Sequence, residues 1–333
     1  MTQPGSPREP VRHVEVSEER AGQRLDNFLM RLLTDVPRSR IYRLVRRGEV
    51  RVNGRRASPE QRLQWHDNVR VPPVRIEAVP RPARASARLI EAVTAAVLHE
   101  DERLIVLDKP AGIAVHGGSG VSLGVIEALR AARPGEELEL AHRLDRDTSG
   151  CLLVARKASS LRALHELLRE GRFEKGYLAL VQGHWNLGRK RIEAPLRTDV
   201  RVSGERTVKV HPSGKPSVSE FRPVQFFGKQ ATLVEVALHT GRTHQIRVHA
   251  AHAGHPVAGD EKYGNEDFNL QMRDLGLERM FLHAHTVSFE WPRGGPFSAS
   301  APLPAELSAV VDRLQSGITG RRNRASATSR RAR

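Results

Sequence analysis

The apolar residues in the first quarter of the chain are spaced as in a small folded unit that runs from about residue 14 to residue 71. In RLDNFLMRLL, Leu25, Phe28, Leu29 and Leu32 recur at helical spacing. Ser39 is expected to cap a second helix, whose apolar residues again follow a helical period. EVRVNGRR and NVRVP then alternate as strands do, and the first enters a turn at an Asn-Gly pair. The pattern predicts two helices followed by a small hairpin.

Longer apolar runs predict a second, larger domain. RLIVLDKP, GCLLVARK, GYLALVQG, ATLVEVAL and HTVSFEW have the length and β-branched content of strands. Helical spacing appears between them in GVIEALRAAR and SSLRALHELLREG. Strands and helices do not alternate strictly, which argues against a parallel sheet built from βαβ units. The sequence therefore predicts an α+β fold with a mixed, largely antiparallel sheet.

Composition marks the borders of these domains. The polar start of the chain and its arginine-rich end, GRRNRASATSRRAR, are typical of disorder, and PPVRIEAVPRPARASAR has the prolines of a linker. The basic end can contact phosphates or be solvated without a specific role. The predicted organisation is a disordered start (1–12), a small α/β domain (13–75), a linker (76–88), a large α+β domain (89–315) and a disordered basic tail (316–333).

The charge of the chain favours nucleic acid as its partner. The 333 residues include 54 Lys and Arg against 38 Asp and Glu, a net charge of +16 that attracts polyanions. The stretch from Gly22 to Arg70 alone holds 12 Arg and 5 acids. A basic but otherwise ordinary enzyme remains the alternative. Phosphate contact is nevertheless expected from the arginines crowded on the second helix and its approach: Arg38, Arg40, Arg43, Arg46 and Arg47.

Cysteine usage and hydropathy indicate a cytoplasmic protein. Cys151 is the single cysteine, which excludes an intrachain disulfide and any zinc site built from several cysteines. No signature surrounds it, so it is expected to be a small buried hydrophobe. The N-terminal segment lacks the apolar core of a signal peptide, and no apolar run is long enough to span a membrane.

A dense polar cluster precedes the apolar run GCLLVARK. The segment HRLDRDTSG carries two acids, Asp145 and Asp147, among charged and hydroxyl side chains that cannot all be buried in a core. The segment therefore lines either a functional cleft or a charge-rich surface loop. The residues alone do not choose between these readings, or between the two acids.

A second polar segment, TGRTHQIRVHAAHAGHP, is expected to form a helix capped by Thr243 and ended by Gly254. Arg247 lies inside this helix, whereas Arg242 lies at its start and can hold a phosphate there. The segment also carries four histidines, of which His249 and His252 can share one helical face. Because no HExxH motif or carboxylate accompanies them, capping, packing or RNA contact is preferred to a metal site.

The small domain resembles the RNA-binding domain of ribosomal protein S4. The features that carry the resemblance are GQRLDNFL, PRSRIYRLVRRGEVRVNG and the closing NVRVP. The resemblance implies that the second helix, with Arg40, Arg43, Arg46 and Arg47, and the hairpin bind the RNA backbone.

The large domain resembles the pseudouridine synthases. HRLDRDTSG matches the family's catalytic motif over its whole length, and LDKPAGIAVHGG, FEKGYLALVQG, TGRTHQIRVHAAHAGHPVAGDEKYG and RMFLHA follow in family order. The resemblance extends from about residue 14 to residue 314 and is strongest to the group that acts on large-subunit (23S) ribosomal RNA. It implies isomerisation of uridine to pseudouridine without metal or cofactor. Because the sequence shows no sign of symmetric assembly and no long apolar run, we expect a monomer with no membrane partner.

The resemblance also implies roles for single residues. Asp145, and not Asp147, is the catalytic carboxylate, and Arg247 pairs with it, with Arg242 as the competing candidate. Tyr177, which the pattern alone would place in the core, stacks on the target base and can assist proton transfer. Arg143 enters the RNA and fills the gap left by the extruded uridine, unless it only contacts a phosphate. Leu282 forms an apolar wall unless it is simply a core residue. Lys175, on the same strand face as Tyr177, is expected to be a solvated lysine.

The chemistry of such an isomerisation requires a carboxylate in a cleft that excludes water. The carboxylate either attacks the anomeric carbon or removes the 2′ proton, and the sequence does not choose between these roles. Two other functions remain to be distinguished: a ribosome-assembly factor that binds RNA without catalysis, and a hydrolase that binds a metal through its histidines.

Overall fold

The computed structural model describes residues 11–33, 36–74, 85–117, 123–200 and 206–317, and the chain divides into two compact units, Met1–Arg84 and Ala85–Arg333. Most of the predicted disordered start, linker and basic tail lie outside the described residues. Ala87 and Arg88, which the sequence placed in the linker, begin helix α3 (Ala87–Ala95), because the Ser86 side chain accepts a hydrogen bond from the Leu89 amide as an N-cap.

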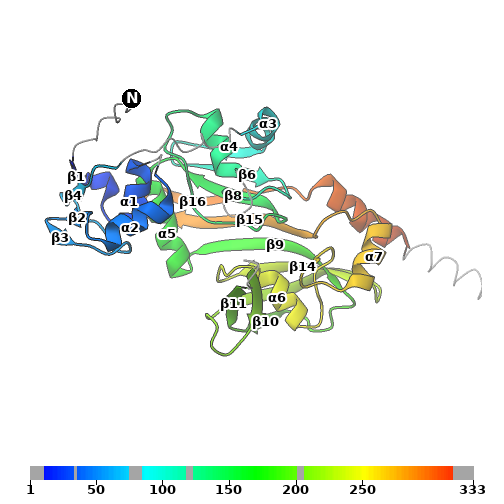
Figure 1. Cartoon of the computed structure of the whole chain (residues 1–333). Coiled ribbons are helices and arrows are strands. Elements are labelled where there is room, and N and C mark those ends of the chain that lie inside the picture. The colour runs from blue at the N-terminus through cyan, green and yellow to red at the C-terminus, as the bar shows by residue number, and fades with distance from the viewer. Residues whose placement is uncertain (1–10, 34–35, 75–84, 118–122, 201–205, 318–333) are drawn as a thin grey trace, which may run out of the picture. The chain divides into compact units, whose positions relative to one another are not determined.

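The first unit contains the predicted pair of helices and hairpin (Figure 1). The elements are β1 (Arg12–Glu15), the short 3₁₀ helix η1 (Glu18–Arg20), α1 (Leu25–Leu32), α2 (Arg38–Arg46), β2 (Arg51–Val52), β3 (Arg55–Arg56) and β4 (Asn68–Val71). Strand β1, which the sequence did not predict, pairs with β4 at the edge of a sheet ordered β1-β4-β2-β3. The predicted cap at Ser39 is wrong, because α2 starts after Pro37 and no side chain caps it.

The core of the first unit is formed by the predicted apolar positions. Leu25, Phe28 and Leu29 of α1 and Ile41 of α2 are at most 1% exposed. They pack with valines of the sheet, such as Val69, in one apolar cluster. Burial of these side chains supplies most of the stabilisation of so small a unit.

The second unit is built on a large mixed sheet, as predicted. Its main path is ordered β10-β13-β14-β9-β15-β8-β6-β5, while β16 and β7 pair with β15 and β8. Every pairing recorded in it is antiparallel except the short parallel contact of β15 with β8. The strands are β5 (Val97–Glu100), β6 (Leu104–Lys109), β7 (Glu139–Leu140), β8 (Ser149–Ala155), β9 (Phe173–Gln182), β10 (Lys190–Glu193), β13 (Val218–Phe227), β14 (Ala231–Leu238), β15 (Leu282–Trp291) and β16 (Gly295–Ser300).

Helices cover both faces of this sheet. Apolar side chains of α3, α4 (Val125–Ala132) and α6 (Gln245–His252) join one cluster, which also contains Leu152 and Tyr177 of the sheet. Helix α5 (Ala158–Glu170) packs with Cys151 and Leu153, while α7 (Glu266–Asp274) and the helix over residues 305–317 pack around Leu180. Alternate residues of β8 therefore enter different clusters, as the two-residue period of a strand requires. Cys151 is buried, as predicted.

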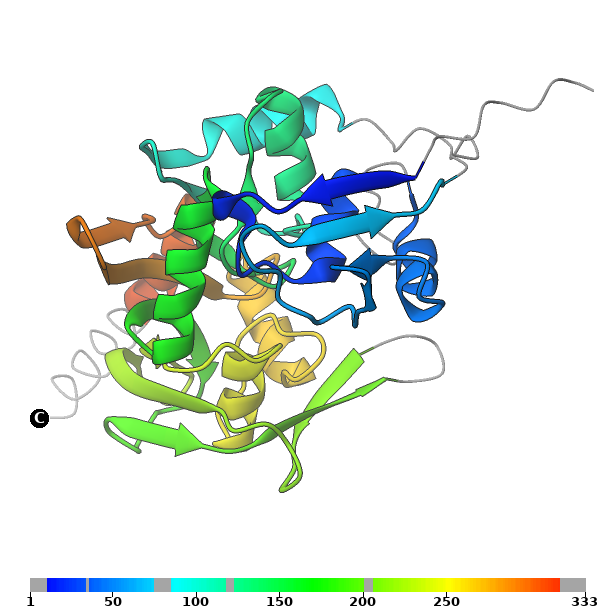
Figure 2. The ribbon, with the colours of Figure 1, turned by 90° about the vertical axis from the view of Figure 1, so that its left-hand side faces the viewer.

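A separate two-stranded ribbon, β11 (Leu196–Val200) and β12 (Arg206–Val210), extends from the sheet (Figure 2). It contacts α6: Val208 and Val248 share a small apolar cluster, which the ring of Tyr263 partly covers. The ribbon thus supports the helix that carries Arg247.

Candidate active site

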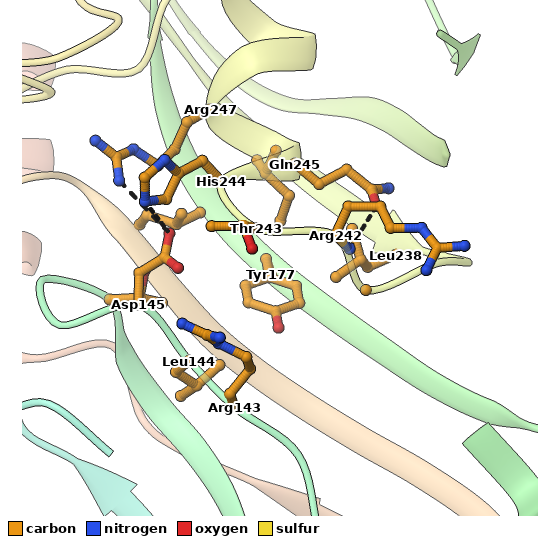
Figure 3. Close-up of a pocket in the computed structure, with 14 residues that line it drawn as sticks. Arg143, Leu144, Asp145, Tyr177, Leu238, Arg242, Thr243, His244, Gln245 and Arg247 are labelled. Atoms are coloured by element: carbon orange, nitrogen blue, oxygen red, sulfur yellow. Dashed lines mark hydrogen bonds and ion pairs between the residues drawn. The ribbon is translucent and has the colours of Figure 1, made fainter. Parts of the chain in front are cut away.

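An open pocket lies where the loop before β8, the middle of β9 and the start of α6 meet. It is lined by residues that the sequence assigned to a site, together with neighbours from the same segments (Figure 3). Of the predicted residues, the structure brings these to the pocket: Arg143, Asp145, Tyr177, Arg242, Arg247 and Leu282.

Asp145 lies in the turn between β7 and β8, which polar contacts hold in place. The Thr148 amide donates to the Asp145 carbonyl at 3.2 Å. The next carbonyl, of Arg146, accepts from the Gly112 amide and from Nζ of Lys109, at 2.9 and 3.0 Å. Lys109 is fully buried and also donates to the carbonyls of Pro110 and Ile113. Burial lowers the pKa of Lys109 to about 7, although three carbonyl acceptors suit the three protons of its charged form.

Gly150, the last residue of the motif HRLDRDTSG, lies where a side chain would not fit. Its φ is +106°, and an added Cβ would lie 2.2 Å from the carbonyl oxygen of Ala284 in β15. Only glycine fits this close approach of β8 to β15. The same short contact between the strands places the loop of Asp145 next to β15, whose Leu282 lines the pocket and is 3% exposed.

Arg247 faces Asp145 from helix α6. Its Nη1 lies 3.5 Å from Oδ2 of Asp145, and both side chains are mostly buried. On its other side, Arg247 donates to Asp260 through Nε at 2.7 Å and through Nη2 at 2.8 Å. Asp260 is 1% exposed and also accepts from the backbone amides of Lys262 and Tyr263. Burial opposes the charge of Asp260, but the hydrogen bonds from Arg247 and these amides lower its pKa below the usual value.

Arg242, the competing partner, points away from Asp145 (Figure 3). Its Nε donates to the carbonyl of Pro216 at 3.1 Å, and its backbone amide donates to Oε1 of Gln245 at 3.0 Å. The structure therefore brings Arg247, rather than Arg242, to the carboxylate. The predicted cap at Thr243 is wrong, because α6 begins after His244 and no side chain caps it. Gly254 follows the helix with a φ of +81°.

His244 is a pocket residue to which the sequence gave no catalytic role. Its Nε2 lies 4.0 Å from Oδ2 of Asp145, and its Nδ1 is 2.8 Å from the hydroxyl of Tyr263. That hydroxyl also accepts from the Val208 amide at 2.9 Å. Burial lowers the pKa of His244; the Asp145 carboxylate opposes this shift and Arg247 adds to it. His244 therefore presents a neutral ring to the carboxylate at neutral pH.

Tyr177 lies on β9 and belongs to both the core and the pocket. It is 6% exposed, packs in the main apolar cluster and lines the pocket next to Leu238. Burial, followed by the charge of Asp145, raises the pKa of Tyr177 above its ordinary value. Its hydroxyl therefore stays protonated, and the side chain forms part of the pocket wall.

The histidines of α6 do not converge on one point. His249 is fully buried, with its ring nitrogens 3.1 Å from Oγ of Ser219 and 3.0 Å from the carbonyl of Ala194. His252 is exposed. Within the described residues, no group of three His, Cys, Asp or Glu side chains is arranged to hold a metal ion.

The first unit presents its own basic surface. Arg43 and Arg46 of α2, and Arg47 directly after it, are exposed, and Arg40 is half-buried, whereas the apolar side of the helix is buried. Arg47 lies 4.0 Å from Glu49. The arginines predicted to contact RNA thus occupy the solvent side of α2.

Every helix in the described part of the chain is too short or too polar to span a membrane.

The fold and the pocket are those of an RNA-modifying isomerase, and comparison with known proteins identifies its family: the chain belongs to the pseudouridine synthases and carries an S4 domain. The RNA pseudouridylate synthase family matches residues 103–252, and the S4 domain matches residues 23–69. The predicted family, enzyme class and α+β fold are thereby confirmed.

Its relatives include curated proteins similar along almost the whole chain. "Ribosomal large subunit pseudouridine synthase C" of Pasteurella multocida is 52% identical over 308 residues, 92% of this chain and 94% of the relative. The protein of the same name from Escherichia coli K12 is 48% identical over 310 residues, 92% of this chain and 97% of the relative. Among solved structures, human RNA pseudouridylate synthase domain containing 4 superposes with a TM-score of 0.57 at 25% identity, over 68% of this chain and 96% of that one.

Proposed function

We propose that this chain converts specific uridines of large-subunit (23S) ribosomal RNA to pseudouridine, with Asp145 as the catalytic carboxylate. The observation that carries the proposal is the Asp145–Arg247 pair in a pocket lined by Tyr177. Relatives that share about half of its residues over nearly their full length are named ribosomal large subunit pseudouridine synthase C. We further propose that the protein acts in the cytoplasm, as a monomer and without a cofactor.

In this proposal each pocket residue acts on an extruded nucleotide. The target base stacks on the ring of Tyr177 against the apolar wall of Leu282. Because Tyr177 keeps its proton, it is suited to stacking rather than to removing a proton. Asp145 acts on the ribose, either at the anomeric carbon or at the 2′ position, and Arg247 holds the carboxylate in place.

Arginines of both units hold the RNA in this proposal. Arg143 fills the space left by the extruded uridine, and Arg242 binds a phosphate at the approach to α6. In the first unit, Arg40, Arg43, Arg46 and Arg47 bind the RNA backbone, and the affinity of the protein should therefore fall steeply with salt.

Two matched variants test the assignment. Asp145→Asn should abolish pseudouridine formation while leaving RNA affinity and thermal stability nearly unchanged. Asp147→Asn is the control, because Asp147 lies two residues away, its side chain is 47% exposed, and the ion pair recorded for it within the described residues is with its neighbour Arg146. It should retain activity. Turnover by the Asp145→Asn protein would reject the role of Asp145.

The substrate is tested by mapping pseudouridine in ribosomal RNA. The RNA is sequenced after carbodiimide treatment from cells with and without the gene, and the sites that disappear identify the target. Sites that vanish from large-subunit RNA and return with the wild-type gene, but not with Asp145→Asn, support the proposal. Identical maps would support the rival function, an assembly factor that binds RNA without modifying it.

A further inference from the structure

Lys175 is a half-buried cation next to the pocket, not the solvated lysine that the sequence predicted. It lies in β9, two residues before Tyr177, and pairs with Val287 across the ladder with β15. Within the described residues, no hydrogen bond or ion pair holds its amine. Other lysines of the same unit do have partners: Lys157 pairs with Glu102 and Lys209 with Asp199.

The amine of Lys175 reaches the wall of the pocket at Gly241. A Cβ placed on Gly241 would lie 3.9 Å from Nζ of Lys175, and Gly241 itself lines the pocket. Because glycine has no side chain, nothing at this position stands between the amine and the pocket. Arg242, which follows Gly241, carries a second cation on the same loop.

Partial burial of this amine without an anionic partner destabilises the protein. Burial alone lowers the pKa of Lys175 to about 8, with no carboxylate acting in the opposite direction. Partial desolvation of an unpaired ammonium destabilises a fold, and such groups occur where a ligand supplies the missing charge. Asp145 and Tyr177 mark the end of the pocket that acts on the ribose and base. Lys175 and Arg242 place two cations at Gly241, another part of the pocket lining, where we expect the backbone of an entering strand.

We propose that the ammonium of Lys175 binds a phosphate of the RNA strand directly beside the target uridine, through the gap at Gly241. The inference rests on the proposed function, since it assigns the backbone contact of the same pocket. It makes Lys175 a positioning residue: it fixes the register of the strand so that one nucleotide reaches Tyr177.

The first test measures RNA affinity of the full-length protein against salt concentration. Lys175→Gln should bind unmodified target RNA about tenfold more weakly at low salt. The slope of log affinity against log salt should become less steep by about one unit, which is the contribution of a single phosphate contact. Lys175→Arg should keep the wild-type slope. Lys229→Gln is the control, because Lys229 is exposed in the turn between β13 and β14, at the far end of β14 from Leu238 of the pocket.

The second test locates the phosphate. In an RNA fragment that the wild-type protein modifies, each of the two phosphates flanking the target uridine is replaced in turn by an uncharged methylphosphonate. One replacement should weaken wild-type binding about tenfold and have no further effect on Lys175→Gln, because the two changes remove the same contact.

Three outcomes would overturn the inference: an unchanged salt slope in Lys175→Gln, equal losses from the methylphosphonates in wild type and variant, or a lower melting temperature of Lys175→Gln, which would indicate a structural role. An unpaired cation instead predicts an equal or higher melting temperature. Binding is measured separately from turnover. Absence of pseudouridine formation by the wild type therefore contradicts the proposed function. The change in the salt slope tests only the phosphate contact of Lys175.

Discussion

Asp260 holds Arg247 through two hydrogen bonds, of 2.7 and 2.8 Å, and leaves Nη1 of the same guanidinium facing Asp145 at 3.5 Å. The Arg247 side chain is 10% exposed and that of Asp260 is fully buried. Asp260 therefore fixes the direction in which Arg247 presents its remaining edge. The ring of Tyr263, 5.0 Å from the guanidinium carbon, covers the face of the same group.

Asp260→Asn should cost both activity and stability. The amide retains an oxygen for the backbone amides but loses the charge and one acceptor, so that Arg247 is free to turn onto Asp145. We expect the single-turnover rate to fall about 10- to 100-fold, as for other residues that orient a site. The free energy of unfolding should fall by about 3 kcal/mol, as when one partner of a buried pair is removed.

The matched control for this change is Asp199→Asn. Asp199 also binds an arginine and a lysine, Arg197 and Lys209, but on the exposed ribbon of β11 and β12. Its substitution should leave the melting temperature and the rate nearly unchanged. If Asp260→Asn behaves as this control does, Asp260 does not orient Arg247.

The contact between Asp260 and Arg247 also shows what the sequence could not predict. The apolar periods located the strands and helices, because each period follows from the geometry of one element. Resemblance selected Arg247 and Asp145. Asp260 was missed, since a contact between a helix and the loop that follows it leaves no periodic signal. Its only trace was its place in the segment GDEKYG. Lys175 was misjudged for a related reason: burial at a strand end depends on neighbours that are distant in sequence.

Tyr263→Phe tests whether the hydroxyl of Tyr263 positions His244. Phenylalanine keeps the ring over Arg247 but leaves Nδ1 of His244 and the amide of Val208 without their shared partner. We expect a stability loss of about 1 kcal/mol and a rate lower by about tenfold, because the imidazole beside Asp145 is no longer fixed. Single-turnover rates and thermal unfolding measure the two effects. Full activity in this variant would mean that the orientation of His244 does not matter.

Gly150→Ala tests the strand contact that places the catalytic loop. The added Cβ would meet the carbonyl oxygen of Ala284 at 2.2 Å, on a backbone with a φ of +106°. We expect a loss of about 3 kcal/mol or more in the free energy of unfolding. Gly171→Ala is the control: its φ is also positive, +71°, but nothing lies within 4 Å of the added atom. It should cost about 1 kcal/mol. Equal costs, measured by denaturant unfolding, would mean that the close approach of β8 to β15 does not require glycine.

The pKa of Lys175 predicts how RNA binding depends on pH. Burial lowers this pKa to about 8 in the free protein, and only the charged amine attracts a phosphate. Bound phosphate favours the charged form and raises the pKa again, so RNA binding and protonation are linked. Affinity should therefore be highest below pH 8 and fall as the pH rises through that value.

Other titratable groups near Lys175 should not produce the same pH dependence of RNA affinity. Burial, and then the charge of Lys175, lowers the pKa of His142 to about 4, so His142 stays neutral across the range. The measurement compares affinities for unmodified RNA at pH 7 and pH 9.5 at constant ionic strength. Wild type should weaken by up to about tenfold, whereas Lys175→Gln should show a much smaller change. A wild-type affinity that does not change with pH would contradict a phosphate contact made by this amine.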